Sequence, residues 1–184
     1  MNIDGDAGKL MCSFDGDADR IVFHAFATQD ETASAKWILF DGDKIAAVIS
    51  LLLSQELKAA KLDDTFKIGV VQTAYANGAS TLFFEQNAIP VTFAKTGVKY
   101  LHHKAQEFDL GIYFEANGHG TVLLSKPFLD ALSSWQAPEA VPGHDAPREV
   151  VAMNRLQVQL SPLQCCHTLV TLTIADGGRD DQPP

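Results

Sequence analysis

Residues 67–114 read KIGVVQTAYANGASTLFFEQNAIPVTFAKTGVKYLHHKAQEFDLGIYF, and this stretch decides the fold. Apolar runs of strand length alternate within it with longer segments that have helical spacing. The expected strands are residues 67–72, 89–94 and 110–114, and the expected helices are residues 80–86 and 98–108. Strands separated by helices of this length favour βαβ units. The sequence therefore predicts an α/β fold, a βαβ-type mixed sheet with flanking helices.

Upstream of this stretch, a short apolar run at residues 36–40 precedes a helix expected over residues 44–60. The apolar side chains of that helix recur at helical spacing, at Ile45, Val48, Ile49, Leu52 and Leu53. Asp41 or Asp43 can cap the helix by accepting hydrogen bonds from its first free backbone N–H groups. A helix start explains both carboxylates, so we do not interpret them as metal ligands. Residues 1–35 contain two expected strands around a tight acidic loop.

The last third of the chain has weaker periodicity. Seven of the eight prolines lie beyond Lys126, and they interrupt any regular pattern of apolar residues. A short helix at residues 150–158 and a strand at residues 168–174 are the ordered segments expected there, and neither has an obvious partner. We therefore expect residues 127–184 to be divergent and poorly ordered.

Length and composition exclude several classes of function. The chain has 184 residues, 46% of them hydrophobic, so it can bury one core. Its net charge of −9 and its lack of a basic stripe argue against nucleic acid as a partner. No apolar run approaches the ~20 residues of a membrane span, and the polar opening residues do not resemble a signal peptide. Three cysteines give no even disulfide framework, which favours a cytoplasmic location, and no obligate protein partner is evident.

Residues 12–20, CSFDGDADR, are the most informative stretch for function. Asp15, Asp17 and Asp19 alternate with small residues in a tight turn, and we expect Gly16 to supply the backbone freedom that the turn needs. Converging carboxylates repel one another by about 4 kcal/mol per pair at a separation of ~4 Å and an effective dielectric of ~20. A divalent cation removes that repulsion, and hard oxygen ligands suit Mg²⁺.

Three other interpretations compete with a magnesium site. The simplest is a solvated acidic turn. A calcium EF-hand needs Gly and Glu at its sixth and twelfth positions, where this chain has Arg20 and Phe26, so that interpretation fails. A phosphatase of the haloacid-dehalogenase type would use Asp15 as nucleophile and Asp17 as acid. Such enzymes usually have Thr or Val where this chain has Asp19.

A second polar loop, EANGHGT at residues 115–121, follows the last expected strand. In open α/β sheets, ligands bind where the strands end. Glu115 accepts hydrogen bonds, whereas Asn117 both donates and accepts them, which suits pairs of sugar hydroxyls. From spacing alone, a plain turn remains the alternative.

The string DGDADR at residues 15–20 resembles the metal-binding loop of the α-D-phosphohexomutases. The resemblance implies that Asp15, Asp17 and Asp19 bind Mg²⁺, whose remaining ligand is the phosphate on a catalytic serine. It also implies that Arg20 lies beside the transferring phosphoryl group and stabilises its charge.

Residues 96–125 are similar, nearly residue for residue, to the phosphoacetylglucosamine mutase branch of that superfamily, which also carries strings like those at residues 70–80 and 41–46. Other phosphohexomutases have Gly-Glu-x-Ser-Gly-His where this chain has EANGHG. The resemblance implies that the substrate-binding residues are Glu115, Ala116, Asn117, Gly118 and His119. It makes Lys99 a candidate catalytic residue for proton transfer or phosphate contact, with a solvated helix face as the alternative.

The resemblance covers roughly residues 10–126 and fades after Ser125, apart from a faint echo at residues 148–156. It implies one near-complete phosphohexomutase domain and part of another. In that division, residues 1–35 end the second domain, residues 36–126 form the third, and residues 127–184 are a divergent tail.

The activity that the resemblance implies is interconversion of N-acetylglucosamine 6-phosphate and N-acetylglucosamine 1-phosphate, for UDP-N-acetylglucosamine biosynthesis. It runs through a phosphoserine and a bisphosphate intermediate. The loop that carries this serine, Ser followed by His-Asn-Pro, does not occur in these residues. We therefore expect the chain alone to be inactive. The alternative is a non-catalytic fragment that binds sugar phosphate or a partner.

Overall fold

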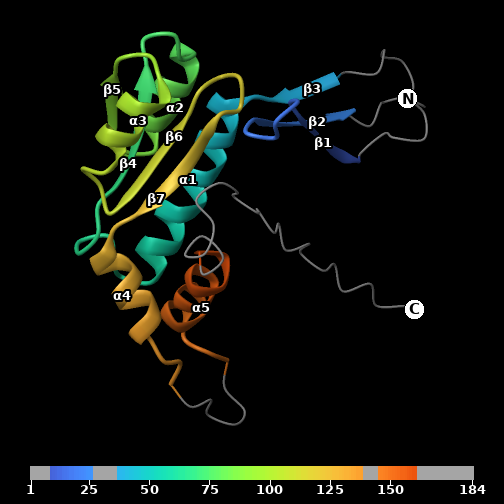
Figure 1. Cartoon of the computed structure of the whole chain (residues 1–184). Coiled ribbons are helices and arrows are strands. Elements are labelled where there is room, and N and C mark those ends of the chain that lie inside the picture. Colours follow the sequence, from blue (N-terminus) through green and yellow to red (C-terminus); the bar gives the residue numbers. More distant parts are fainter. Residues whose placement is uncertain (1–8, 27–36, 139–144, 161–184) are drawn as a thin grey trace, which may run out of the picture.

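The computed structural model describes residues 9–26, 37–138 and 145–160. Within these ranges the chain forms two sheets and five helices (Figure 1). In chain order the elements are β1 (Leu10–Phe14), β2 (Ile21–Phe26), β3 (Trp37–Phe40), α1 (Gly42–Ala59), β4 (Ile68–Thr73), α2 (Gly78–Gln86), β5 (Val91–Ala94), α3 (Val98–Ala105), β6 (Leu110–Phe114), β7 (Gly120–Leu124), α4 (Lys126–Ser134) and α5 (Arg148–Leu160).

The larger sheet has the strand order β5-β4-β6-β7. β4 runs parallel to both of its neighbours, so that Val70 lies opposite Val91 on β5 and Ile112 on β6. β7 is antiparallel to β6, with Val122 opposite Ile112. Parallel neighbours need a crossover, and α2 and α3 supply the two crossovers between β4, β5 and β6. The α/β fold with a mixed sheet, predicted from the sequence, is confirmed.

Helices cover both faces of this sheet. Successive side chains of a strand point to opposite faces, and β4 and β6 therefore contribute to two apolar clusters. Val70 and Ile112 belong to the larger cluster, which contains the buried residues of α1. Val71 and Tyr113 belong to the smaller cluster, which contains Leu101 of α3. The parallel strands β4, β5 and β6 end at one edge of this layered unit, and the loop between β6 and β7 begins at that edge.

α1 is the longest helix described. Asp41 caps it by accepting a hydrogen bond from the backbone N–H of Lys44 at 3.1 Å, as one of the two expected caps. The apolar residues buried along it are Ile45, Ala46, Ile49, Leu53 and Leu57. Val48 and Leu52, which helical spacing placed with them, are 40% and 41% exposed. The buried stripe is therefore narrower than the sequence indicated.

The smaller sheet is antiparallel, in the order β1-β2-β3, and lies beside the start of α1 (Figure 1). The β1–β2 hairpin pairs Phe14 with Ile21, directly flanking the acidic loop. β3 pairs with β2, with Phe40 opposite Phe23. The sequence analysis began the second structural unit at residue 36, but strand pairing extends the smaller sheet to Phe40.

The chain continues as ordered helices beyond β7, where the sequence analysis expected a poorly ordered tail. Ser125 caps α4, since its Oγ accepts a hydrogen bond from the backbone N–H of Phe128 at 3.3 Å. Pro127 fits the first turn of α4 because its missing N–H would have no partner there. Pro127, one of the prolines clustered in the last third of the chain, therefore belongs to a helix start.

Both C-terminal helices pack into the main core. Phe128 and Leu132 of α4, and Leu156 of α5, are at most 1% exposed. α5 extends the short helix expected at residues 150–158 by a few residues at its ends. The expected strand at residues 168–174 lies outside the described residues. Among those described, no helix combines the length and apolarity needed to cross a bilayer.

Candidate functional site

The acidic loop is the turn of the β1–β2 hairpin. The backbone N–H of Ala18 donates to the carbonyl of Asp15 at 3.3 Å and closes the turn. Ala18, with φ of 59°, adopts the left-handed conformation that the turn requires. Gly16 is not at a positive φ, so our expectation that it supplies the backbone freedom of the turn is wrong.

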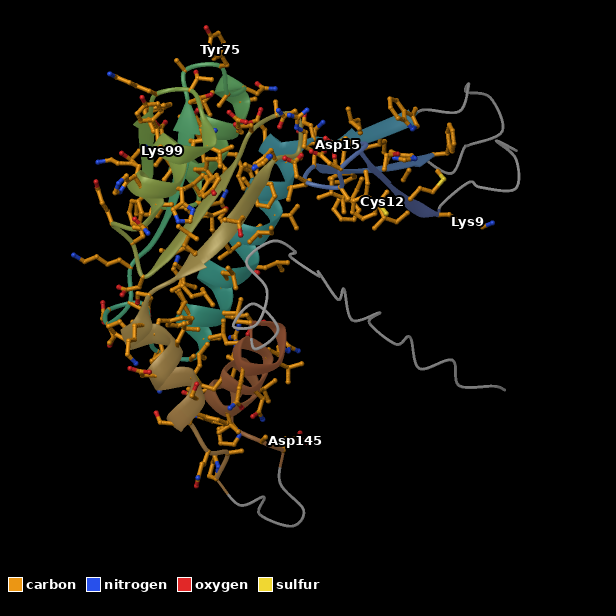
Figure 2. All side chains as sticks on the ribbon, viewed as in Figure 1. Lys9, Cys12, Asp15, Tyr75, Lys99 and Asp145 are labelled. Carbon is orange, nitrogen blue, oxygen red and sulfur yellow. The ribbon has the colours of Figure 1, made fainter. Side chains whose placement is uncertain are left out.

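The turn brings three carboxylates together. Asp15, Asp17 and Asp19 each offer an oxygen, and these oxygens all lie within 4.8 Å of one another. The hairpin carries them at its tip, where Figure 2 labels Asp15. Three partly exposed, hard oxygen donors at this separation fit a small divalent cation, which would offset their mutual repulsion. Carboxylate clusters also occur without a metal. The support for a Mg²⁺ site is that the type and spacing of these oxygen ligands suit the ion.

Arg20 is held close to this cluster. Its backbone N–H donates to Asp15 Oδ1 at 3.2 Å, and its Nε lies 3.6 Å from both Asp15 Oδ2 and Asp19 Oδ1. The guanidinium has five N–H donors, and Nε supplies one of them. The remaining donors of the half-exposed side chain can bind an anion next to the carboxylates.

The second loop, residues 115–119, is a tight turn between β6 and β7. Backbone hydrogen bonds join Glu115 N to the carbonyl of His119 at 2.8 Å and Gly118 N to the carbonyl of Glu115 at 2.9 Å. The side chain of Asn117 accepts from the N–H of His119 through Oδ1 at 2.9 Å. The amide group of Asn117 can therefore still donate to a ligand, and the Glu115 carboxylate can accept.

The structure brings these two loops into direct contact, although nearly a hundred residues separate them in the sequence. The backbone N–H of Ile21 donates to the carbonyl of Gly118 at 3.2 Å. The ring Nδ1 of His119 lies 3.2 Å from Asp19 Oδ2. The carboxylate cluster and the 115–119 loop therefore form one composite site.

Gly118 permits this approach. It has φ of 88°, and a Cβ at this position would lie 2.1 Å from the carbonyl oxygen of Ile21. No other residue type tolerates both the conformation and the contact without moving the backbone.

The start of α1 holds the 115–119 loop from its other side. The backbone N–H of Gly42 donates to the carbonyl of Ala116 at 3.2 Å, and a Cβ on Gly42 would lie 1.7 Å from the carbonyl oxygen of Glu115. The next residue, Asp43, is 7% exposed and accepts from the backbone N–H of Asn77 at 3.1 Å. Burial raises the pKa of the Asp43 carboxyl, and the Asn77 hydrogen bond opposes that shift.

This first turn of α1 was missed as a functional element by the sequence analysis. The string DGD at residues 41–43 was correctly interpreted as a helix start, which accounts for Asp41. Nothing in the local pattern showed that Gly42 and Asp43 would each bind a different loop. The burial of Asp43 therefore appears only in the structure, where its carboxylate accepts the Asn77 hydrogen bond.

The structure does not place Lys99 with the composite site. Lys99 is exposed on α3, and Figure 2 shows it well apart from Asp15. A neighbouring side chain on α3, His102, lies with its Nδ1 3.2 Å from the hydroxyl of Tyr113. The contact between His102 and Tyr113 joins α3 to β6 and does not involve Lys99. It therefore favours neither a catalytic role for Lys99 nor a place on a solvated helix face.

Comparison with known proteins identifies the family. Residues 41–176 match the family model described as phosphoacetylglucosamine mutase AMG1, domain III. The chain belongs to the phosphoacetylglucosamine mutase family. The match runs far beyond residue 126, so the expectation that the family pattern ends near Ser125 is wrong.

Curated phosphoacetylglucosamine mutases match this chain over only part of their own length. The protein from Arabidopsis thaliana is 48% identical over 154 residues, which cover 82% of this chain and 27% of the relative. The protein from Saccharomyces cerevisiae is 42% identical over 174 residues, covering 94% of this chain and 28% of the relative. The chain therefore spans about a quarter of the length of the mutases it matches.

Solved structures of phosphoacetylglucosamine mutases share the fold. The Aspergillus fumigatus enzyme in complex with GlcNAc-6P and magnesium superimposes with a TM-score of 0.69 at 38% identity, covering 83% of this chain and 26% of that one. An N-acetylglucosamine-phosphate mutase in its substrate complex gives a TM-score of 0.65 at 40% identity, covering 81% and 26%.

Proposed function

We propose that this chain supplies the metal loop and the sugar loop of a phosphoacetylglucosamine mutase. The whole reaction would interconvert N-acetylglucosamine 6-phosphate and N-acetylglucosamine 1-phosphate through a phosphoserine and a bisphosphate intermediate. The observation that carries this proposal is the contact between the two loops, made by Ile21 with Gly118 and by Asp19 with His119. A metal loop and a sugar loop in contact are what phosphoryl transfer to a sugar hydroxyl requires.

Asp15, Asp17 and Asp19 would bind Mg²⁺ through one oxygen each. When bound, the ion supplies positive charge beside the phosphoryl group. His119 contacts Asp19 from the sugar loop and so fixes the direction of that carboxylate. The metal loop is thereby oriented toward the sugar that the second loop would hold.

The hydrogen-bond donors and acceptors of the other site residues indicate what each would bind. Glu115 and the amide group of Asn117 would bind sugar hydroxyls, while Ala116 and Gly118 shape the loop through their backbone. Arg20 would stabilise the negative charge on the phosphoryl group, because its side chain already lies beside the carboxylates. Lys99 stays a candidate for contact with phosphate from outside this composite site.

The division into domains is part of the same proposal. Strands β1, β2 and β3 form the smaller sheet and would end the second domain of the mutase, while the family model for the third domain begins at residue 41. The contact between β2 and the 115–119 loop would then be the interface between these two domains. Mg²⁺ and the sugar would bind on opposite sides of that interface.

Replacing Asp17 with asparagine should weaken Mg²⁺ binding by roughly thirtyfold. Losing a unit charge about 4 Å from a divalent ion costs about 2 kcal/mol even with full screening by water. The described side chains form no hydrogen bond with Asp17, so the hairpin itself should not change. Calorimetric titration of the purified chain with Mg²⁺, or with Mn²⁺ as a tighter-binding probe, measures the effect.

Asp15→Asn is the informative companion variant. Asp15 also accepts from Arg20 N, so its loss should weaken metal binding and additionally loosen the turn. In a mutase containing these residues, activity of both variants should recover in part at higher Mg²⁺, because an amide oxygen remains. Complete loss at every Mg²⁺ concentration for Asp15→Asn alone would indicate that Asp15 acts as a nucleophile and would contradict the proposal.

The purified 184-residue chain should not turn over N-acetylglucosamine 6-phosphate. No Ser-His pair occurs in its sequence, so the serine loop on which the proposed reaction depends is not present in these residues. The measurement is formation of N-acetylglucosamine 1-phosphate by chain prepared from a host that lacks its own mutase. Turnover above the buffer blank would require another nucleophile among its serines. Binding of sugar phosphate without turnover would support the role of a non-catalytic fragment.

A further inference from the structure

Tyr75 is unusually exposed for an aromatic residue. Its side chain is 83% exposed, the highest value among the large apolar side chains described, whereas Tyr113 is 3% exposed. None of the hydrogen bonds found in the described ranges uses the Tyr75 hydroxyl. An exposed ring of this size gains free energy when a ligand or another surface covers it.

The position of Tyr75 in the fold indicates which kind of ligand could cover its ring. It lies in the loop after β4, the central parallel strand, at the edge of the sheet where α/β proteins bind ligands. Figure 1 shows that the loop between β6 and β7 emerges at the same end of the sheet, and Figure 2 shows Tyr75 projecting outward there. Its backbone N–H donates to Thr73 Oγ1 at 3.3 Å, so a turn fixes the backbone while the ring stays exposed.

The first turn of α1 connects this loop to the sugar loop. Asp43 accepts from the backbone N–H of Asn77, two residues after Tyr75, and Gly42 donates to the carbonyl of Ala116. Because Gly42 and Asp43 are adjacent, one rigid helix end positions both loops. The loop that carries Tyr75 and the 115–119 loop are therefore both attached to the first turn of α1.

The sugar loop offers little apolar surface, since Ala116 is its one exposed residue with an apolar side chain. Glu115 and Asn117 present polar groups, and His119 is engaged by Asp19. An acetamido group combines a methyl with an amide, and a tyrosine ring with its hydroxyl matches both parts.

We propose that Tyr75 determines specificity for the N-acetyl group, by packing its ring against the acetamido group of a hexosamine phosphate held by the 115–119 loop. This inference rests on the proposed function of that loop. Asp43 is then a positioning residue, because it holds the loop that carries Tyr75 without touching the sugar.

The test compares binding of N-acetylglucosamine 6-phosphate and glucose 6-phosphate to the full chain by NMR titration. The wild-type chain should prefer the acetylated sugar. Tyr75→Ala should reduce affinity for it roughly fivefold to tenfold, the effect of about 1–1.4 kcal/mol, and leave glucose 6-phosphate unchanged. Tyr75→Phe should keep most of the preference. Tyr100→Ala, at a tyrosine that is 54% exposed on α3, is the matched control and should have no effect.

Asp43→Ala should lower the preference for the acetylated sugar in the same direction as Tyr75→Ala, whereas Glu115→Gln should weaken both sugars equally. Equal loss for both sugars in Tyr75→Ala, or no loss for either, would overturn the specificity role while leaving the proposed function intact. If the wild-type chain binds neither sugar, the proposed function fails and the inference falls with it. Because Tyr75 is exposed, an unchanged melting temperature should accompany its variants.

Discussion

The Gly118→Ala variant should lose about 2–5 kcal/mol of folding free energy and most of its affinity for Mg²⁺. Gly118 has φ of 88°, which costs an L-residue roughly 1–2 kcal/mol. The new Cβ would also lie 2.1 Å from the carbonyl oxygen of Ile21, and such overpacking typically costs about 1–3 kcal/mol. The clashing atom belongs to the backbone, so no side chain can rotate to relieve it.

The chain can relieve this clash only by separating the two loops. That movement breaks the hydrogen bond from Ile21 to Gly118 and draws His119 away from Asp19. We therefore expect the metal loop to lose its orientation together with the global stability. Urea denaturation measures the first effect, and titration with Mn²⁺ under native conditions measures the second.

Gly16→Ala is the matched control within the same site. A Cβ on Gly16 would meet nothing within 4 Å, and its φ is not positive. We expect the stability of this variant to lie within about 0.5 kcal/mol of the wild type. If Gly118→Ala also behaved this way, the two loops would not be in contact in solution, and the composite site would be wrong.

The Phe128→Ala variant should lose about 3–5 kcal/mol of folding free energy. Phe128 on α4 is fully buried, and its ring packs edge-on against Phe66 with centroids 5.0 Å apart. Removing it leaves a cavity beside Phe66, in the segment between α1 and β4, that the backbone cannot fill without shifting. The change in the urea midpoint at constant slope gives the loss directly.

Phe93→Ala provides the comparison, because this phenylalanine on the edge strand β5 is 57% exposed. Its loss should cost less than about 1 kcal/mol. Similar values for both variants would show that α4 does not belong to the core, and the original expectation of a poorly ordered region after residue 126 would then hold. A large difference would confirm that this region completes the folded unit.

Local sequence signals sufficed for much of the fold. Alternation of apolar runs located β4, β5 and β6, and helical spacing located α1, α2 and α3, because burial on a strand or helix leaves a short-range period in the sequence. β7 was missed because it directly follows a tight turn, and its first two residues, Gly120 and Thr121, were counted with the loop. α4 was missed because the apolar periodicity weakens after Lys126 and prolines cluster there, although Ser125 and Pro127 together form a standard helix start.

The acidic loop could also be recognised from its local sequence. Three carboxylates at alternate positions in a tight turn were expected to converge, and the structure places their oxygens within 4.8 Å of one another. The sequence further indicated Glu115 and Asn117 as a polar loop at a strand end. Each of these features is encoded within about ten consecutive residues, which is why pattern alone could find it.

Only the tertiary structure decided how these pieces combine. The contacts that assemble the site all join residues far apart in the chain. They are the hydrogen bond between Ile21 and Gly118, the pair of His119 with Asp19, and the attachment of two loops to the first turn of α1. Such contacts depend on how closely two backbones approach, and a single sequence carries no periodic signal for that distance. The sequence by itself determined which groups could bind a metal and a sugar; the packing of β2 and α1 around the 115–119 loop determined that they form one site.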